Sequence, residues 1–184
     1  ERPRRARFRR YTETHDIVND MLRAEVVCGD RGAAAMSVVN FTLDGEPMLY
    51  NGQEIGDTSP QSIYARWPVG WAAGCLPKPA AKRALHKELC RLRRAEAALH
   101  RGAVIWLDND RPDDVLSFLR RAGGEEILVV ANLSNRKVRA AVELPEGWVP
   151  ARGSLIESET KASAADGRLV WDLGSCGYFV GRRQ

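Results

Sequence analysis

A histidine and an aspartate stand side by side at positions 15 and 16, within the stretch YTETHDIVND of residues 11–20. A fixed carboxylate such as that of Asp16 can stabilise positive charge that develops in a transition state. A neutral imidazole such as that of His15 can donate a hydrogen bond to a hydroxyl group. The pair could therefore belong to an active site, or it could be an ordinary pair in a surface loop.

Two tryptophans mark a second candidate region, the irregular stretch 57–80. Trp67 and Trp71 lie there among four prolines. A loop of this length is usually functional or unstructured, and its aromatic side chains favour the first. The two rings could stack on flat faces of a ligand. The simpler interpretation is that they pin the loop against the domain beneath it.

Charged side chains near these positions have two interpretations each. Arg66 could reach a ligand, but we expect it to pair with a carboxylate such as Glu54 or Asp57. Glu13 lies three residues before Asp16. On a strand, residues at odd separation point to opposite faces, so we expect Glu13 to point away from Asp16.

Composition describes a globular chain. The 184 residues are 44% hydrophobic and 28% charged, with a net charge of +4, which allows a sizeable core. No run approaches the roughly 20 apolar residues of a membrane span, so we expect no membrane partner. Six of the 28 basic residues are arginines in the first ten positions. Such a run could bind the phosphates of a nucleic acid, but no recognition motif accompanies it, and we expect a solvated edge and no nucleic-acid partner.

The cysteines favour a reducing compartment. They lie at positions 28, 75, 90 and 176 without CxxC spacing, and no histidine stands at a zinc-ligand interval from them. So few cysteines in a chain this long are not typical of a disulfide framework. We expect reduced, mostly buried thiols, no metal and no cofactor, and a weak preference for the cytoplasm.

The elements before residue 57 predict a parallel βαβ unit. Residues 7–14 are compatible with a strand, so that His15 and Asp16 fall where the strand passes into a loop. Residues 31–43 carry helix formers and apolar groups on most faces, which predicts a buried helix. Residues 48–50 predict a second short strand, and a strand, helix and strand in this order imply parallel neighbours.

The clearest predicted helix spans residues 80–102. Leu85, Leu89, Leu92 and Leu99 recur at helical spacing on one face, and Gly102 supplies a stop signal. This helix leads into a region of different periodicity.

Short strand-like runs follow residue 102 with turn dipeptides between them. The runs are AVIWLD, DVLSFLRR, EILVVANLS, KVRAAVEL, GSLIES, RLVWDL and GYFVGRR. Strands at this spacing without intervening helices predict an antiparallel β-sandwich. We expect Trp106, Trp148 and Trp171 in its core or in contacts between domains.

The two parts differ in completeness. A parallel βαβ layout with functional residues at strand ends suits a (β/α)8 barrel, which takes on the order of 250 residues, and only about 100 residues precede the predicted sandwich. We therefore predict a remnant of an α/β barrel, its last βα units, over residues 1–101 and an all-β antiparallel sandwich over residues 102–184. The missing partner is the upstream barrel of the same protein.

Several stretches in order resemble the α-amylase family of glycoside hydrolases. RFRRYTETHD resembles the last active-site motif of the family, a strand ending in Glu-Asn-His-Asp. FTLDGEPMLYNGQEIGD is similar to the following helix end and eighth strand, and RWPVGW to a motif of the next loop. LHKELCRLRRAEAALHRG resembles the linking helix, and VLSFLRRAGGEEILVVANLSN the opening strands of the C-terminal sandwich.

The resemblance implies roles for individual residues. It places Asp16 at the catalytic aspartate that favours the distorted, positively charged transition state, and His15 at the neighbouring histidine that binds sugar hydroxyls. A retaining mechanism also needs a nucleophile and an acid/base about 5–5.5 Å apart. In the family, the nucleophile and the acid/base come earlier in the sequence than the motif around Asp16. Neither motif appears in these 184 residues, so we expect this chain alone to be inactive. Arg66, Trp67 and Trp71 are candidate substrate-binding residues.

The expected partner is an α-glucan or maltooligosaccharide. Three positions depart from the family pattern: Thr14 replaces an asparagine, Asn19 stands where many members have an arginine, and Gln53 replaces an aspartate. Hydrolase, transglycosylase, α-glucosidase and isomerising synthase therefore all stay open. The alternative is a non-catalytic structural or glycan-binding module with an amylase-like fold.

Overall fold

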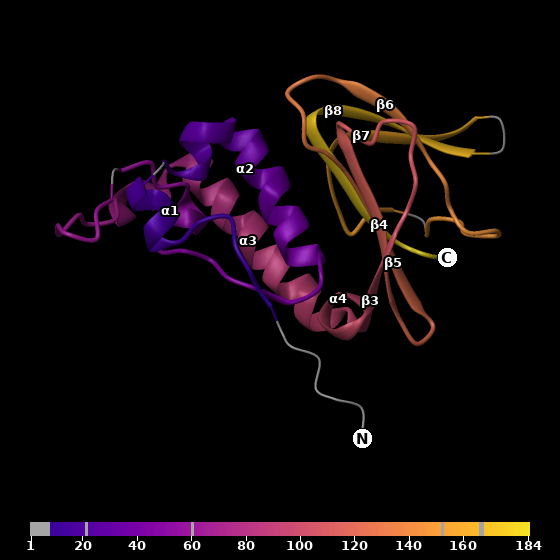
Figure 1. Ribbon diagram of the computed structural model, residues 1–184, viewed down its shortest axis with the longest axis horizontal. Coiled ribbons are helices and arrows are strands. Elements are labelled where there is room, and N and C mark those ends of the chain that lie inside the picture. The colour runs from indigo at the N-terminus through magenta and orange to yellow at the C-terminus, as the bar shows by residue number, and fades with distance from the viewer. Residues whose placement is uncertain (1–7, 21, 60, 152, 166–167) are drawn as a thin grey trace.

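The computed structural model describes residues 8–20, 22–59, 61–151, 153–165 and 168–184. Helices gather on one side of the molecule and a curled sheet on the other (Figure 1). The helices are α1 (His15–Asp20), α2 (Ala24–Thr42), α3 (Pro77–Ala95) and α4 (Ala97–Arg101), with 3-10 turns η1 (Gln53–Ile55) and η2 (Trp71–Cys75). The strands are β1 (Arg9–Arg10), β2 (Glu46–Pro47), β3 (Ala103–Trp106), β4 (Val115–Ala122), β5 (Glu125–Asn132), β6 (Val138–Val142), β7 (Ile156–Ala165) and β8 (Arg168–Arg182).

The predicted parallel βαβ unit is confirmed. β1 and β2 pair in parallel, with Arg9 opposite Glu46, and α2 connects them. Both strands are much shorter than predicted, and β2 precedes the expected 48–50. The Glu46 N–H donates to the Phe8 carbonyl at 2.7 Å and the Met48 N–H to the Arg10 carbonyl at 2.8 Å.

Helix α2 begins earlier than the predicted residue 31. It starts at Ala24 and is interrupted at Gly29, whose φ of 70° lies in the left-handed region where glycine is favoured. The predicted part after this break is helical and largely buried. The small side chains of Ala33 and Ala35 let the helix approach its neighbours closely.

The predicted helix 80–102 is two helices. α3 starts at Pro77, since proline suits the first helical turn, and the chain leaves helical geometry at Glu96. Glu96 is buried and pairs with Arg182 of β8, whose Nε lies 2.9 Å from its carboxylate. This pairing across the fold ends the helix where the sequence pattern continues. The predicted leucine face is confirmed, with Leu89, Leu92 and Leu99 buried and Leu85 partly buried.

The strands after residue 102 form one curled antiparallel sheet. Its order is β3-β4-β5-β8-β6, with β7 also paired to β8. The prediction of separate strands over 168–173 and 177–183 is wrong, because β8 runs through both. Its first half pairs with β6 and its second half with β5, and the bend falls near Cys176, whose φ is 54°. A Cβ at Gly177 would lie 2.8 Å from the Glu159 carbonyl oxygen, so the crossing strand leaves no room there for a side chain.

Both faces of β5 are covered, and two apolar clusters result. One cluster lies between the sheet and helices α2 to α4; it includes Val38, Phe41, Leu89, Leu92, Leu99, Phe118, Ile127, Val129 and Val180. The other lies inside the curl of the sheet; it includes Leu119, Leu128, Val130, Val142, Trp148, Trp171, Leu173 and Phe179. Because both faces of β5 are buried, its sequence is a continuous apolar run and does not alternate between apolar and polar residues.

Two buried arginines join the helices to each other and to the sheet. Arg93 of α3 donates to the carbonyls of Phe41 and Leu43, at 2.7 and 2.8 Å. Arg120 of β4 donates to the carbonyls of Thr42 and Gly102. The last four carbonyl groups of a helix have no hydrogen-bond partner within the helix. The guanidinium groups of Arg93 and Arg120 supply donors to such carbonyls at the end of α2. Burial lowers the pKa of Arg120 to about 10.

Two smaller predictions are corrected. Trp148 and Trp171 are buried as expected, but Trp106 is 60% exposed on β3, with its ring edge-on to Phe118. The four cysteines are unpaired, yet only Cys176 is buried. No helix among the described residues combines the length and apolarity of a membrane span.

Candidate functional site

His15 and Asp16 lie in the first turn of α1. The Thr14 hydroxyl accepts a hydrogen bond from the Ile17 N–H at 3.3 Å and so caps this helix. The prediction that the pair follows directly on a strand is wrong, since β1 ends at Arg10. His15 Nε2 lies 3.3 Å from Asp16 Oδ1, and the two side chains are 64% and 70% exposed. Both groups are thus open to a ligand from solvent.

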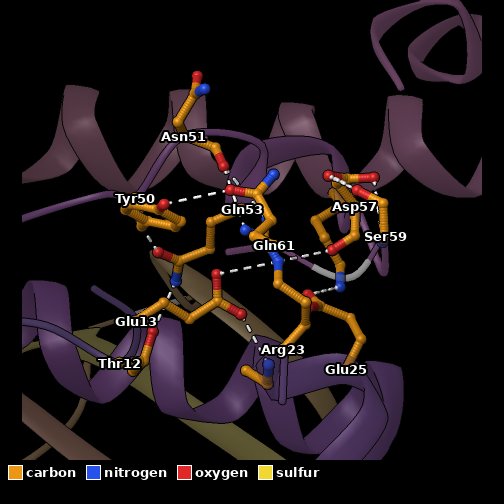
Figure 2. Close-up of polar contacts among 12 residues, drawn as sticks. Thr12, Glu13, Arg23, Glu25, Tyr50, Asn51, Gln53, Asp57, Ser59 and Gln61 are labelled. Carbon is orange, nitrogen blue, oxygen red and sulfur yellow. Dashed lines mark hydrogen bonds and ion pairs between the residues drawn. The ribbon is translucent and has the colours of Figure 1, made fainter. Parts of the chain in front are cut away.

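The segments that leave β1 and β2 meet at one edge, because the two strands are parallel. Figure 2 shows how polar side chains join them. Gln53 Nε2 donates to the Thr12 hydroxyl at 2.6 Å, and Gln53 Oε1 accepts from the Tyr50 N–H at 3.1 Å. Gln53, which departs from the family pattern, therefore fastens the segment after β2 to the segment that leads to His15.

Glu13 and Arg23 form the buried base of this site. Glu13 Oε1 accepts from the Ala24 N–H at 2.7 Å, and Glu13 Oε2 lies 3.5 Å from Arg23 Nε. Their side chains are 0% and 2% exposed. Burial raises the pKa of the Glu13 carboxyl, and the Ala24 N–H and the Arg23 charge partly oppose this. Glu13 lies outside β1, so the strand alternation that we expected does not apply; its side chain is buried whereas that of Asp16 is 70% exposed.

Arg23 reaches the segments beyond β2. Its Nε donates to the Asp57 carbonyl at 2.7 Å, and its two terminal nitrogens donate to the Asn51 carbonyl at 3.2 and 3.3 Å. Its guanidinium carbon also lies 5.5 Å from the centre of the Tyr50 ring. A single side chain therefore ties three segments together (Figure 2).

The predicted substrate-binding residues lie on the segment 57–76. Arg66 and Trp67 line one open hollow of about 410 Å³, together with Gln61, Ser62, Ala65 and Pro68. Trp71 starts η2 and does not line this hollow. Both tryptophans are exposed. The Ile63 N–H donates to Asn19 Oδ1 at 3.2 Å, which connects this segment to α1.

The expected pairing of Arg66 is wrong. Within the described ranges no carboxylate lies in ion-pair distance of Arg66, and the Asp57 carboxylate instead accepts from the Ser59 hydroxyl at 2.6 Å. Arg66 is exposed and open to solvent.

Sequence reasoning identified the exposed pair but missed Arg23 and the role of Glu13. In the sequence, only the charge of Glu13 close to His15 pointed to a role for this residue. No spacing rule links residue 13 to residue 23, so their contact was not predictable. The residues that the structure describes contain no group of three or more histidine, cysteine, aspartate or glutamate side chains suited to a metal. What the arrangement offers is an exposed carboxylate and imidazole that can bind hydroxyl groups and favour positive charge. The arginine-rich start lies largely outside the described residues, in positions 1–7.

Comparisons with known proteins agree on one family. Residues 106–180 match the family described as maltogenic amylase, C-terminal domain. The chain is 29% identical over 154 residues to a cyclomaltodextrinase of Geobacillus thermopakistaniensis, covering 80% of this chain and 25% of that protein. It is 26% identical over 110 residues to α-amylase 2 of Dictyoglomus thermophilum, covering 55% of this chain and 18% of that protein. The chain thus spans about a quarter or less of these curated relatives.

Solved structures show the same fold. A maltogenic α-amylase from Thermotoga neapolitana superposes with a TM-score of 0.74 at 21% identity, over 97% of this chain and 42% of that one. A debranching enzyme from Nostoc punctiforme gives a TM-score of 0.70 at 18% identity, over 94% and 35%. Residues 106–180 therefore match a maltogenic amylase C-terminal domain, and the chain as a whole is similar to cyclomaltodextrinase and amylase sequences of the α-amylase family of glycoside hydrolases.

Proposed function

We propose that this chain is the C-terminal part of an α-amylase-family glycosidase that cleaves or transfers α-glucosidic bonds by a retaining mechanism. Asp16 and His15 belong to its active site. The observation that carries this proposal is the exposed His15–Asp16 pair, held at the edge where β1 and β2 both end. Cyclomaltodextrinase and α-amylase relatives support an α-glucan or maltooligosaccharide as the substrate.

The roles of the two side chains follow from the chemistry of glycoside cleavage. The transition state resembles an oxocarbenium ion, so a carboxylate held near the sugar ring lowers its energy. Asp16 supplies that carboxylate, and His15 donates a hydrogen bond to a sugar hydroxyl. The nucleophile and the acid/base come from an upstream barrel, so the 184 residues by themselves have no turnover. Arg66, Trp67 and Trp71 border the substrate, with the tryptophan rings against sugar faces.

The open edge of β1 supports an upstream barrel as the partner. A hollow of about 370 Å³ lies between β1 and α2, lined among others by Tyr11, Val39, Asn40 and Leu43. Tyr11 is exposed, and the buried amide nitrogen of Asn40 has no hydrogen-bond partner among the described residues. An unpaired strand edge with apolar neighbours is able to pair with further strands. Residues 1–101 are then the end of a (β/α)8 barrel and residues 102–184 the C-terminal domain, its curled sheet forming a β-sandwich.

The decisive experiment replaces Asp16 by asparagine in the full-length protein. Asp16 is largely exposed, so Asp16→Asn should leave folding intact and lower kcat on maltooligosaccharides by at least about a hundredfold. Asp44→Asn is the matched control: Asp44 is also exposed but lies before β2, at the opposite edge of the strand pair, where it contacts Arg10. Equal turnover of Asp16→Asn and Asp44→Asn would exclude the catalytic role.

A glycan-binding role of the sheet is a second candidate, favoured by the exposed ring of Trp106. Titration of the 184-residue chain with maltooligosaccharides tests it. Saturable binding that Trp106→Ala abolishes would support this role, and binding that Trp106→Ala leaves intact would exclude it.

A further inference from the structure

We propose that Glu13 is a positioning residue for Asp16. The inference deepens the proposed function and rests on it. Glu13 closes the base of the segment 14–22, which carries both His15 and Asp16, and this closure sets where the Asp16 carboxylate lies relative to a bound sugar.

The closure joins two points that lie on either side of the pair. Glu13 Oε1 accepts from the Ala24 N–H at 2.7 Å, at the first turn of α2. N–H groups there have no partner inside the helix, and a carboxylate is favoured at this end of the helix dipole. This hydrogen bond fixes residue 13, which precedes the pair, to residue 24, which follows it.

Arg23 anchors this closed segment to the rest of the site. It lies 3.5 Å from Glu13 Oε2 while it donates to the carbonyls of Asn51 and Asp57. The base of the segment is therefore fixed to the chain that follows β2 as well as to α2 (Figure 2). Loss of the Glu13 carboxylate would release one end of the segment and leave Arg23 buried without its anionic neighbour.

Besides this closure, the segment is held by the buried side chain of Val18 in α1 and by hydrogen bonds of moderate length. α1 has six residues, and a helix of this length is marginal by itself. Asp16 is exposed, and its own contact is with the adjacent His15. Hydrogen bonds that hold α1 among the described residues include the Thr14 cap at 3.3 Å and the bond from the Ile63 N–H to Asn19 at 3.2 Å. The buried hydrogen bond from the Ala24 N–H to Glu13 is shorter than both, at 2.7 Å.

The experiment compares three variants of the full-length protein: Glu13→Ala, Glu13→Gln and Glu25→Gln. Glu25 is the matched control because it is buried nearby, in the first turn of α2, but it pairs with Lys82 of α3 and not with the segment 14–22. Turnover is measured on maltooligosaccharides and divided by the folded fraction, so that lost stability does not count as lost catalysis.

We expect Glu13→Ala to lower kcat about a hundredfold with KM changed less than about threefold, since a displacement near 1 Å costs about this much. Glu13→Gln should recover at least about tenfold of the loss, because its amide oxygen can still accept from the Ala24 N–H. Glu25→Gln should lower the melting temperature and leave kcat per folded molecule unchanged. If Glu13→Ala does not fold, Glu13→Asp replaces it, with a shorter reach and an expected loss of about tenfold.

Two results would overturn the inference. One is an unchanged kcat per folded molecule in Glu13→Ala, and the other is a loss in Glu25→Gln that equals the loss in Glu13→Ala. Asp16→Asn, measured in parallel, separates this failure from failure of the proposed function. A large loss in Asp16→Asn with unchanged Glu13 variants removes only the positioning role, whereas full activity of Asp16→Asn removes both.

Discussion

The curled sheet and the segment before it bury different kinds of side chain. Inside the curl, the buried cluster is apolar throughout, with Trp171 as its largest member. Around the base of the candidate site, buried charges gather instead: Glu13, Arg23 and Glu25, with Lys82 against Glu25. The apolar cluster stabilises the fold by removing apolar surface from water. Buried charges cost desolvation energy, and their main contribution is to fix the positions of the segments that they join.

The sheet therefore supplies most of the stability of the fold, whereas the buried charges position the segments of the candidate site. We expect the sheet to lose a surface side chain at little cost in stability. We expect the polar base to tolerate little change, because each of its charged members contacts another. Four measurements would break or sharpen the comparison.

The largest effect is expected in the core of the sheet. Trp171→Ala should lower the free energy of unfolding of the chain by about 3–5 kcal/mol, because it deletes a fully buried ring and leaves a cavity. Urea unfolding followed by tryptophan fluorescence measures it. Trp106→Ala, at an exposed position, should cost less than about 1 kcal/mol. Similar losses in both variants would contradict the assignment of the stabilising core to the inside of the curl.

The next effect lies at the junction of the two regions. Arg120→Met leaves the carbonyls of Thr42 and Gly102 without their donor, and we expect a loss of about 2 kcal/mol in the same measurement. Arg121→Met is the control, since Arg121 is 44% exposed and pairs with Glu126 at the rim. If Arg120→Met is no more costly than Arg121→Met, the arginine does not hold the regions together.

A smaller, pH-dependent effect is expected among the helices. His86 is buried between α3 and α2, with Nδ1 3.0 Å from the Lys82 carbonyl and Nε2 3.3 Å from the Ser37 hydroxyl. Burial lowers the pKa of His86 below its ordinary 6.5, and the hydrogen bond with the Lys82 carbonyl partly opposes this. The Lys82 charge also lowers the pKa, while Glu54 and Glu25 raise it. The unfolded chain therefore binds a proton first as the pH falls through about 6.5, and stability decreases until the pH reaches the folded pKa.

The His86 effect is measured as the slope of unfolding free energy against pH between pH 7.5 and 5.5, a range chosen around 6.5. His86→Gln should flatten this slope, and His100→Gln, at an exposed position of α4, should not. The raised pKa of Glu13 acts in the opposite direction, because the folded chain then takes up the proton first. Comparing variants at each pH cancels this contribution. An unchanged slope in His86→Gln would contradict the prediction.

The smallest effect is expected for an exposed pair that also bridges the regions. Arg31 of α2 lies 2.7 Å from Glu159 of β7, with side chains 62% and 42% exposed. Solvent screens such pairs, so Arg31→Ala should cost less than about 1 kcal/mol, and less still at high salt. A loss comparable to that of Arg120→Met would show that surface charge, and not the buried guanidinium, joins helices and sheet.

Much of the fold was predictable from local pattern. The leucine face of α3 and α4, the antiparallel strands after residue 102 and the parallel βαβ unit all follow from periodicity and turn chemistry, because each depends on residues close in sequence. The apolar run of β5 was recognisable as a strand for the same reason. At the candidate site, the His15–Asp16 pair was visible because its two members are adjacent.

The features that the sequence did not determine depend on residues far apart in the chain. The break at Glu96 follows from its pairing with Arg182, and the continuous β8 follows from a bend that accommodates Glu159. Likewise the closure of Glu13 on Ala24 and its contact with Arg23 exist only once α2 has packed and the two parallel strands have brought their ends together. Periodicity reports which face of an element is apolar; a hydrogen bond between distant groups requires the backbone to be placed to within a fraction of an ångström, and only the packed tertiary structure does that.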